Sequence, residues 1–166
     1  MTPRDTYDYL VRARRDLVHA LEETPDPVLS RPVLPGPKFR SIKDLLFHIA
    51  EVEDGWINGD IRHGEFIQNA FPDLRNGGPD FSTFPLAILT GYWQRVEQST
   101  SAWIATLTPD DLAATVAVED WPEKHFTVDG LLSHVMIHEM RHTAQIAMLL
   151  CQQGIKPPSL DLLFYL

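Results

Sequence analysis

The stretch LLSHVMIHEMRHTAQIAMLL, from Leu131 to Leu150, decides how the rest of the chain is interpreted. Three of the seven histidines of the chain lie in it, at positions 134, 138 and 142. A spacing of four places them along one face of a helix, because each helical residue advances by about 100°. Buried imidazoles need partners for their ring nitrogens, and a metal ion can supply one. The stretch therefore predicts a helix that carries a functional column of histidines.

The composition bounds the class of protein and its partners. At 166 residues, the chain is expected to form one domain spanning residues 1–166. The formal net charge of −9 argues against nucleic acid or an anionic membrane as a partner. A single cysteine, Cys151, excludes an internal disulfide. There is no apolar signal region, and no run approaches the roughly 18 apolar residues of a membrane span, so we expect a cytoplasmic protein.

Four segments combine a helix start signal with apolar residues at helical spacing. The sequences Thr2-Pro3-Arg4-Asp5 and Ser41-Ile42-Lys43-Asp44 resemble capping boxes, and predict helices that end near residues 23 and 61. A third helix is expected from residue 82 or 83, with Pro85 in its first turn. The fourth runs from Thr127 to Gly154. Without a convincing sheet, the pattern indicates an all-α four-helix bundle with long connections.

The connecting segments are expected to be irregular. Residues 24–40 contain five prolines and predict an extended strap without a regular helix. Residues 62–80 form a long link that Gly77-Gly78-Pro79 interrupts. Residues 114–119 are expected to be extended, followed by a loop from Trp121 to Phe126. The apolar tail from Leu160 to Leu166 should fold back on the bundle or cover a partner subunit.

Several charged residues are assigned to solvent by their helical positions. Arg12, Arg14 and Arg15 are expected on the solvated side of the first helix. Glu53 and Asp54 project away from the apolar stripe of the second helix, and we expect them to be solvated.

The sequence His138-Glu139-Met140-Arg141-His142 matches the H-E-x-x-H pattern of zinc proteases. In such enzymes the glutamate acts as general base toward a zinc-activated water. The residues after His142 contain neither the glycine nor the further histidine of an extended signature, and Asp161 is their only acid. We therefore regard a metalloprotease as the weakest of the functional hypotheses.

His48 is a candidate third ligand from another part of the chain. It falls on the apolar stripe of the second predicted helix and therefore points into the bundle. A single core-facing histidine is more often a structural residue than a ligand. Facing helices of a bundle do build metal sites in its interior, however, and three histidines leave coordination positions open for water or substrate. Imidazole ligands suit zinc, nickel, copper or iron.

The segments LLFHIAEVEDGWI, TPDDL and HVMIHEMRHTAQI together resemble the DinB/YfiT-like superfamily, over nearly the whole chain. The resemblance implies an up-down-down-up four-helix bundle, a metal triad of His48, His138 and His142, and a homodimer. Where many members carry a second histidine before the last ligand, this chain has Arg141, which changes the charge of the pocket. The implied metal is a divalent transition metal, with zinc or nickel favoured over iron.

The resemblance also implies a metal-dependent activity on a small molecule, with a thiol S-transferase or hydrolase as the leading types. The metal would activate a low-molecular-weight thiol as its thiolate, or a water. A non-catalytic metal-binding or stress-response protein is the alternative. We interpret His134 as a pocket residue and not a fourth ligand, and Gln145 as an orienting partner or a packing residue. Glu139 could act as a base only by turning inward, and is otherwise a solvated or interhelical charge.

Overall fold

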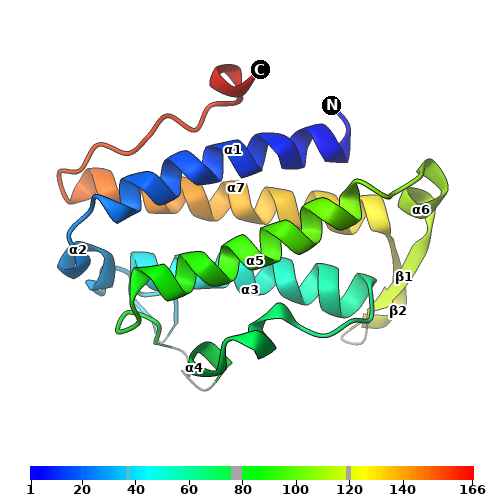
Figure 1. The fold of residues 1–166 in the computed structure, drawn as a ribbon, viewed down its shortest axis with the longest axis horizontal. Helices are drawn as coiled ribbons and strands as arrows, with labels where there is room; N and C mark the ends of the chain where they lie inside the picture. The colour runs from blue at the N-terminus through cyan, green and yellow to red at the C-terminus, as the bar shows by residue number, and fades with distance from the viewer. Residues whose placement is uncertain (37, 76–79, 119–120) are drawn as a thin grey trace.

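The computed structural model describes residues 1–36, 38–75, 80–118 and 121–166, which are mostly helical and include one two-stranded sheet. Four long helices lie side by side (Figure 1): α1 (Pro3–Glu22), α3 (Ile42–Asp54), α5 (Leu86–Ile104) and α7 (Val128–Gln152). A π-helix, η1 (Gly55–Ile61), continues α3. In Figure 1, α1 and α7 run in one direction and α3 and α5 in the other.

The helix starts follow from local side-chain chemistry. Thr2 and Asp5 exchange the two hydrogen bonds of a capping box at the start of α1, and Ser41 and Asp44 do the same for α3. Thr127 accepts a hydrogen bond from the Gly130 amide at the start of α7. These predicted starts are confirmed. α5 instead begins at Leu86, because Pro85 is extended, with ψ 135°, and lies before the helix.

Short helices interrupt both long connections. The prediction that the proline-rich strap has no regular helix was wrong for α2 (Asp26–Ser30). A proline in the first turn of a helix is tolerated, because no intrahelical acceptor awaits its missing N–H there. Elements η2 (Ile67–Ala70) and α4 (Pro72–Arg75) lie in the second connection. The interruption predicted at 77–79 lies outside the described residues.

A β-hairpin precedes α7, so the expectation of no sheet was wrong. After α6 (Pro109–Ala113), strand β1 (Thr115–Val118) pairs antiparallel with β2 (Trp121–Thr127). β1 falls in the segment that we predicted to be extended, whereas β2 replaces the predicted loop. The buried side chains of the hairpin are mainly those of Val116 and Val118, which belong to β1. The hairpin ends directly at the first turn of α7, beside η1 (Figure 1).

Within the described part of the chain, the core consists of two clusters of buried apolar side chains. One joins the ends of α1, α3, α5 and α7 that lie near α2, and includes Trp93, Tyr92 and the stacked rings of Phe47 and Phe81. The other joins the opposite part of α1 and α7 to η1 and the hairpin, and includes Tyr7, Leu132 and Ile57. α3 and α7, which carry the candidate ligands, contact each other directly.

Arg14 and Glu53 are buried, so their predicted exposure to solvent was wrong. Arg14 is 3% exposed and donates hydrogen bonds to Glu53 of α3, Glu97 of α5 and Glu139 of α7. The Tyr7 hydroxyl donates to Glu53 as well. One guanidinium therefore joins side chains from all four long helices.

Asp54 is also buried and not solvated. Its carboxylate accepts hydrogen bonds from the Tyr92 hydroxyl at 2.9 Å, from the Asn58 side chain, and from the backbone amides of Ile67 and Gln68. Asp54 thereby fixes the second connection against the end of α3. Helical periodicity could not show this, because three of these four donors come from outside the predicted helix.

The C-terminal tail folds back along α1 (Figure 1). The Tyr9 hydroxyl donates to the Leu160 carbonyl, and the Tyr165 hydroxyl donates to Asp16 at 2.6 Å. The short 3-10 helix η3 (Leu162–Tyr165) leaves Leu163 and Phe164 exposed. Among the described residues, no helix is long and apolar enough to cross a membrane.

Candidate metal centre

The structure brings His48, His138 and His142 together between α3 and α7. One ring nitrogen from each lies within 4.8 Å of the others. The Nε2 atoms of His48 and His138 are 3.1 Å apart, close to the roughly 3.4 Å between two ligands of tetrahedral zinc. The ring centroids of His138 and His142 are 4.3 Å apart, as expected for residues one turn apart on α7.

The environment of the two rings on α7 favours their neutral form, which a metal ligand must have. Burial, together with the charges of His142 and His48, lowers the pKa of His138 to about 3. Burial also lowers the pKa of His142. A neutral imidazole holds a lone pair on one of its nitrogens, so the rings are suited to a divalent metal in their chemistry as well as their spacing.

Gln145 orients the ring of His142. Its Oε1 lies 2.6 Å from Nδ1 of His142, and an amide oxygen can only accept, so Nδ1 carries the proton. The lone pair of His142 is therefore on Nε2, the nitrogen left for a metal. This contact favours the orienting role among the two roles predicted for Gln145, because such partners fix the tautomer of ligand histidines.

Phe39 covers the His48 ring, which sequence reasoning missed. The two ring centroids are 4.0 Å apart, and Phe39 has a backbone φ of 56°, which is uncommon for a residue with a side chain. Nδ1 of His48 is buried without a hydrogen-bond partner among the described residues, and Glu51 Oε2 lies 3.7 Å from it. Phe39 lies in the proline-rich strap, where no periodicity points toward a site.

A model of the DinB superfamily matches residues 9–146. The chain belongs to the DinB superfamily. This confirms the predicted family, and the matched range contains all three histidines. Comparison with curated proteins gave no match.

Glu139 of this DinB chain is not placed to act on a group held by the histidines. Its side chain is buried and directed to α1, where both carboxylate oxygens accept hydrogen bonds from Arg14, at 3.1 and 2.7 Å. The interhelical role foreseen for Glu139 is thus the one observed. The H-E-x-x-H pattern therefore lacks its general base as well as its downstream ligand.

His134 and two tryptophans form an aromatic group beside the triad. The His134 ring centroid is 6.3 Å from that of His138 and 5.3 Å from that of Trp56. The rings of Trp56 and Trp121 are nearly parallel, at 4°, with centroids 6.2 Å apart. The metal-capable group among the described residues does not include His134. Trp56 belongs to the π-helix η1 and Trp121 to strand β2 of the hairpin.

Proposed function

We propose that this DinB chain is a metal-dependent enzyme that acts on a small molecule, with His48, His138 and His142 as ligands of a divalent transition metal. The convergence of three imidazoles from two helices, two of which have a pKa lowered by burial, is the observation that carries the proposal. When bound, a zinc or nickel ion, or alternatively iron, would supply a Lewis acid that lowers the pKa of a thiol or a water.

The residues of the chain itself support a thiol S-transferase or hydrolase. Gln145 fixes the tautomer of His142, and Phe39 shields one face of His48 from water. Three protein ligands leave coordination positions free, which is typical of reactive zinc sites and not of closed structural ones. The aromatic group of Trp56, Trp121 and His134 offers apolar surface to the part of a substrate that does not react.

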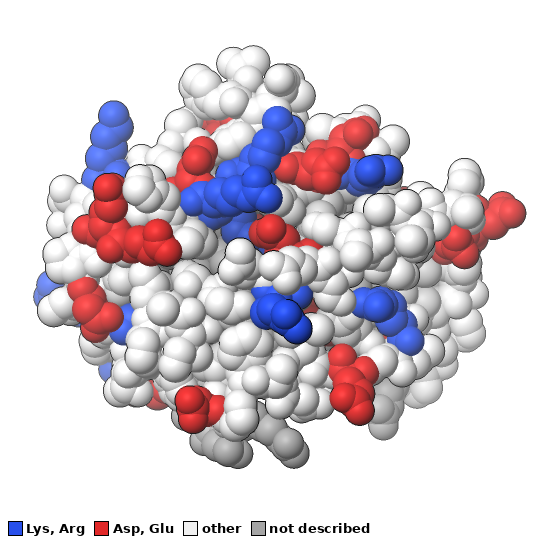
Figure 2. All heavy atoms as spheres, viewed as in Figure 1, with Lys and Arg blue, Asp and Glu red and all other residues white. Residues whose placement is uncertain are grey.

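We also propose the arrangement of the helices and the partners of the chain. We take the four long helices as the up-down-down-up bundle of the family in one domain, and the exposed tail residues Leu163, Phe164 and Leu166 as part of a homodimer contact. On the face shown in Figure 2, acidic and basic side chains are interspersed. This supports a small-molecule substrate, such as a low-molecular-weight thiol, over nucleic acid or a membrane. A cytoplasmic location stays a prediction from the sequence.

Metal analysis tests the ligand set. Protein purified without chelators or nickel resin is expected to carry about one zinc or nickel ion per chain, and His48→Ala is expected to lose it. His19→Ala is the matched control, because His19 is exposed on α1 and should leave the metal unchanged. If His48→Ala still binds metal stoichiometrically, the proposed triad is refuted.

An activity screen separates the enzyme from the alternative, a non-catalytic metal-binding or stress-response protein. Metal-loaded protein is incubated with low-molecular-weight thiols and an electrophile, and separately with ester and amide substrates. Turnover that is lost in His138→Ala supports the enzyme. A loaded protein without turnover in either assay would favour the non-catalytic protein.

A further inference from the structure

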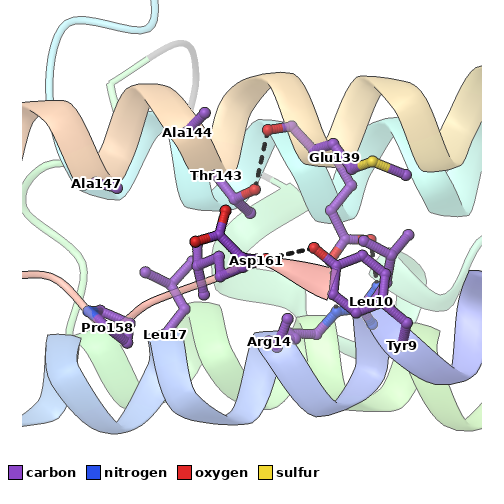
Figure 3. Close-up of a pocket in the computed structure, with 13 residues that line it drawn as sticks. Tyr9, Leu10, Arg14, Leu17, Glu139, Thr143, Ala144, Ala147, Pro158 and Asp161 are labelled. Atoms are coloured by element: carbon purple, nitrogen blue, oxygen red, sulfur yellow. Dashed lines mark hydrogen bonds and ion pairs between the residues drawn. The ribbon is translucent and has the colours of Figure 1, made fainter. Parts of the chain in front are cut away.

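A cavity lies between α1, α7 and the C-terminal tail. Its volume is about 340 Å³, which is at the small end of the range for ligand sites. Figure 3 shows Tyr9 and Arg14 of α1 facing Glu139 and Thr143 of α7, with Asp161 of the tail between the two helices. None of the three candidate metal ligands lines this cavity.

The side-chain donors around the cavity are already engaged. Four hydrogen bonds from Arg14 go to carboxylates, so four of its five N–H groups are used. The Tyr9 hydroxyl donates to the Leu160 carbonyl, and the Thr143 hydroxyl donates to the Met140 carbonyl at 3.1 Å. A ligand in the cavity would therefore find few side-chain donors among the described lining residues.

Acceptors are left over at the same place. Asp161 receives one hydrogen bond, from Ser159 to Oδ2, which leaves Oδ1. The oxygens of Tyr9 and Thr143 each keep lone pairs after donating their protons. The positive charge of Arg14 is already balanced by carboxylates, since Glu53, Glu97 and Glu139 all contact it. The cavity is therefore acceptor-rich and negatively charged.

The remainder of the lining is apolar, and several of its side chains are alanines. Ala13 and Leu17 come from α1, Ala144 and Ala147 from α7, and Leu160 from the tail. Such a lining accommodates a short alkyl chain and leaves the polar end to hold a head group. The formal net charge of −9 also favours the approach of a cation.

We propose that this cavity binds a small primary alkylammonium ion, with the ammonium group at the acceptor oxygens of Asp161, Tyr9 and Thr143 and the alkyl chain against the alanines. An ammonium group is the chemical match, because it presents three donors, no acceptor and a positive charge. The tail residues Pro158, Leu160 and Asp161 form one wall, so a bound ammonium ion would hold the tail against α7.

The probe is n-butylammonium chloride, titrated into the protein at neutral pH and followed by amide chemical shifts in NMR spectra. We expect a dissociation constant of about 1 mM, which is reasonable for a ligand of this size, with shifts at Thr143, Ala147 and Leu160. n-Butanol and butyrate, which share the chain but lack the charge or reverse it, should bind at least about tenfold more weakly. Equal shifts with n-butanol, or none at about 100 mM amine, would overturn the proposal.

Variants locate the bound amine. Asp161→Asn should weaken binding about tenfold, because it removes the charged acceptor, and Ala147→Leu should abolish it by filling the cavity. Asp110→Asn is the matched control on exposed α6 and should bind as the wild type does. His48→Ala should also bind the amine normally. Loss of binding in His48→Ala would place the amine at the histidines and contradict the inference, whatever the metal analysis shows.

Discussion

Replacing Arg14 by methionine isolates the contribution of the buried charges. Methionine keeps most of the apolar stem of the side chain but leaves Glu53, Glu97 and Glu139 without their shared cation. Breaking a buried ion pair by removing one partner costs about 3 to 5 kcal/mol. In a chain of this length, each kcal/mol lowers the melting temperature by about 2 to 4 °C. We therefore expect Arg14→Met to melt at least about 6 °C below the wild type.

The pH dependence of this loss identifies its cause. Burial raises the pKa of the Glu97 carboxyl even beside Arg14, and removal of the cation should raise it further. A carboxyl with a raised pKa in the folded state stabilises the fold at low pH, and that stability is lost as the pH rises through the raised pKa. The deficit of Arg14→Met should therefore shrink as the pH is lowered from neutral toward about 5.

The assay is thermal unfolding followed by circular dichroism across this pH range. Arg12→Met is the matched control, because Arg12 is exposed on the same helix. Its melting temperature should stay within about 2 °C of the wild type at each pH, since surface substitutions change stability little. An Arg14→Met protein that is as stable as the control, or whose deficit is the same at every pH, would refute the reasoning.

Three further substitutions test single contacts. Gln145→Leu should weaken zinc binding about tenfold in a chelator competition assay, because the proton of His142 Nδ1 loses its acceptor; unchanged affinity would leave Gln145 a packing residue. Asp54→Ala should lower the free energy of unfolding by about 3 kcal/mol or more in urea titrations, because buried donors lose their acceptor. Asp73→Ala is its exposed control, and equal losses would contradict this role. The melting temperature of Glu97→Gln should rise relative to that of the wild type as the pH increases from about 5 to 7.5, since the amide cannot ionise. Parallel curves of melting temperature against pH would show that Glu97 keeps its ordinary pKa.

Local signals in the sequence predicted the helix starts and the family. A capping box such as Thr2 with Asp5 satisfies its own backbone amides, so four consecutive residues suffice to recognise it. The spacing of His138 and His142 is likewise a property of one helix. The pairing with His48, ninety positions away, followed from the apolar stripe of its helix together with the family resemblance.

The buried charges could not be predicted in the same way. Helical periodicity compares a residue only with its own helix, and by that criterion Arg14 and Glu53 belong at the surface. Both are buried because they meet each other, and the partners come from different helices. The β-hairpin was missed for a related reason: β2 has mostly exposed side chains, so it lacks the alternation that marks a half-buried strand.

The π-helix after α3 decides which side chains of residues 55–61 meet the hairpin. A π turn holds one residue more than an α turn, so residues 55–61 contain, in effect, an insertion within a helix. Deleting one residue there would remove the insertion and restore an α-helical repeat, so the side chains of this segment would follow one another at about 100°. His48 and Asp54 would keep their places, whereas residues 55–61 would meet the hairpin with different side chains. A relative with an uninterrupted helix at this point would therefore be expected to line the surface beside its histidines with different residues.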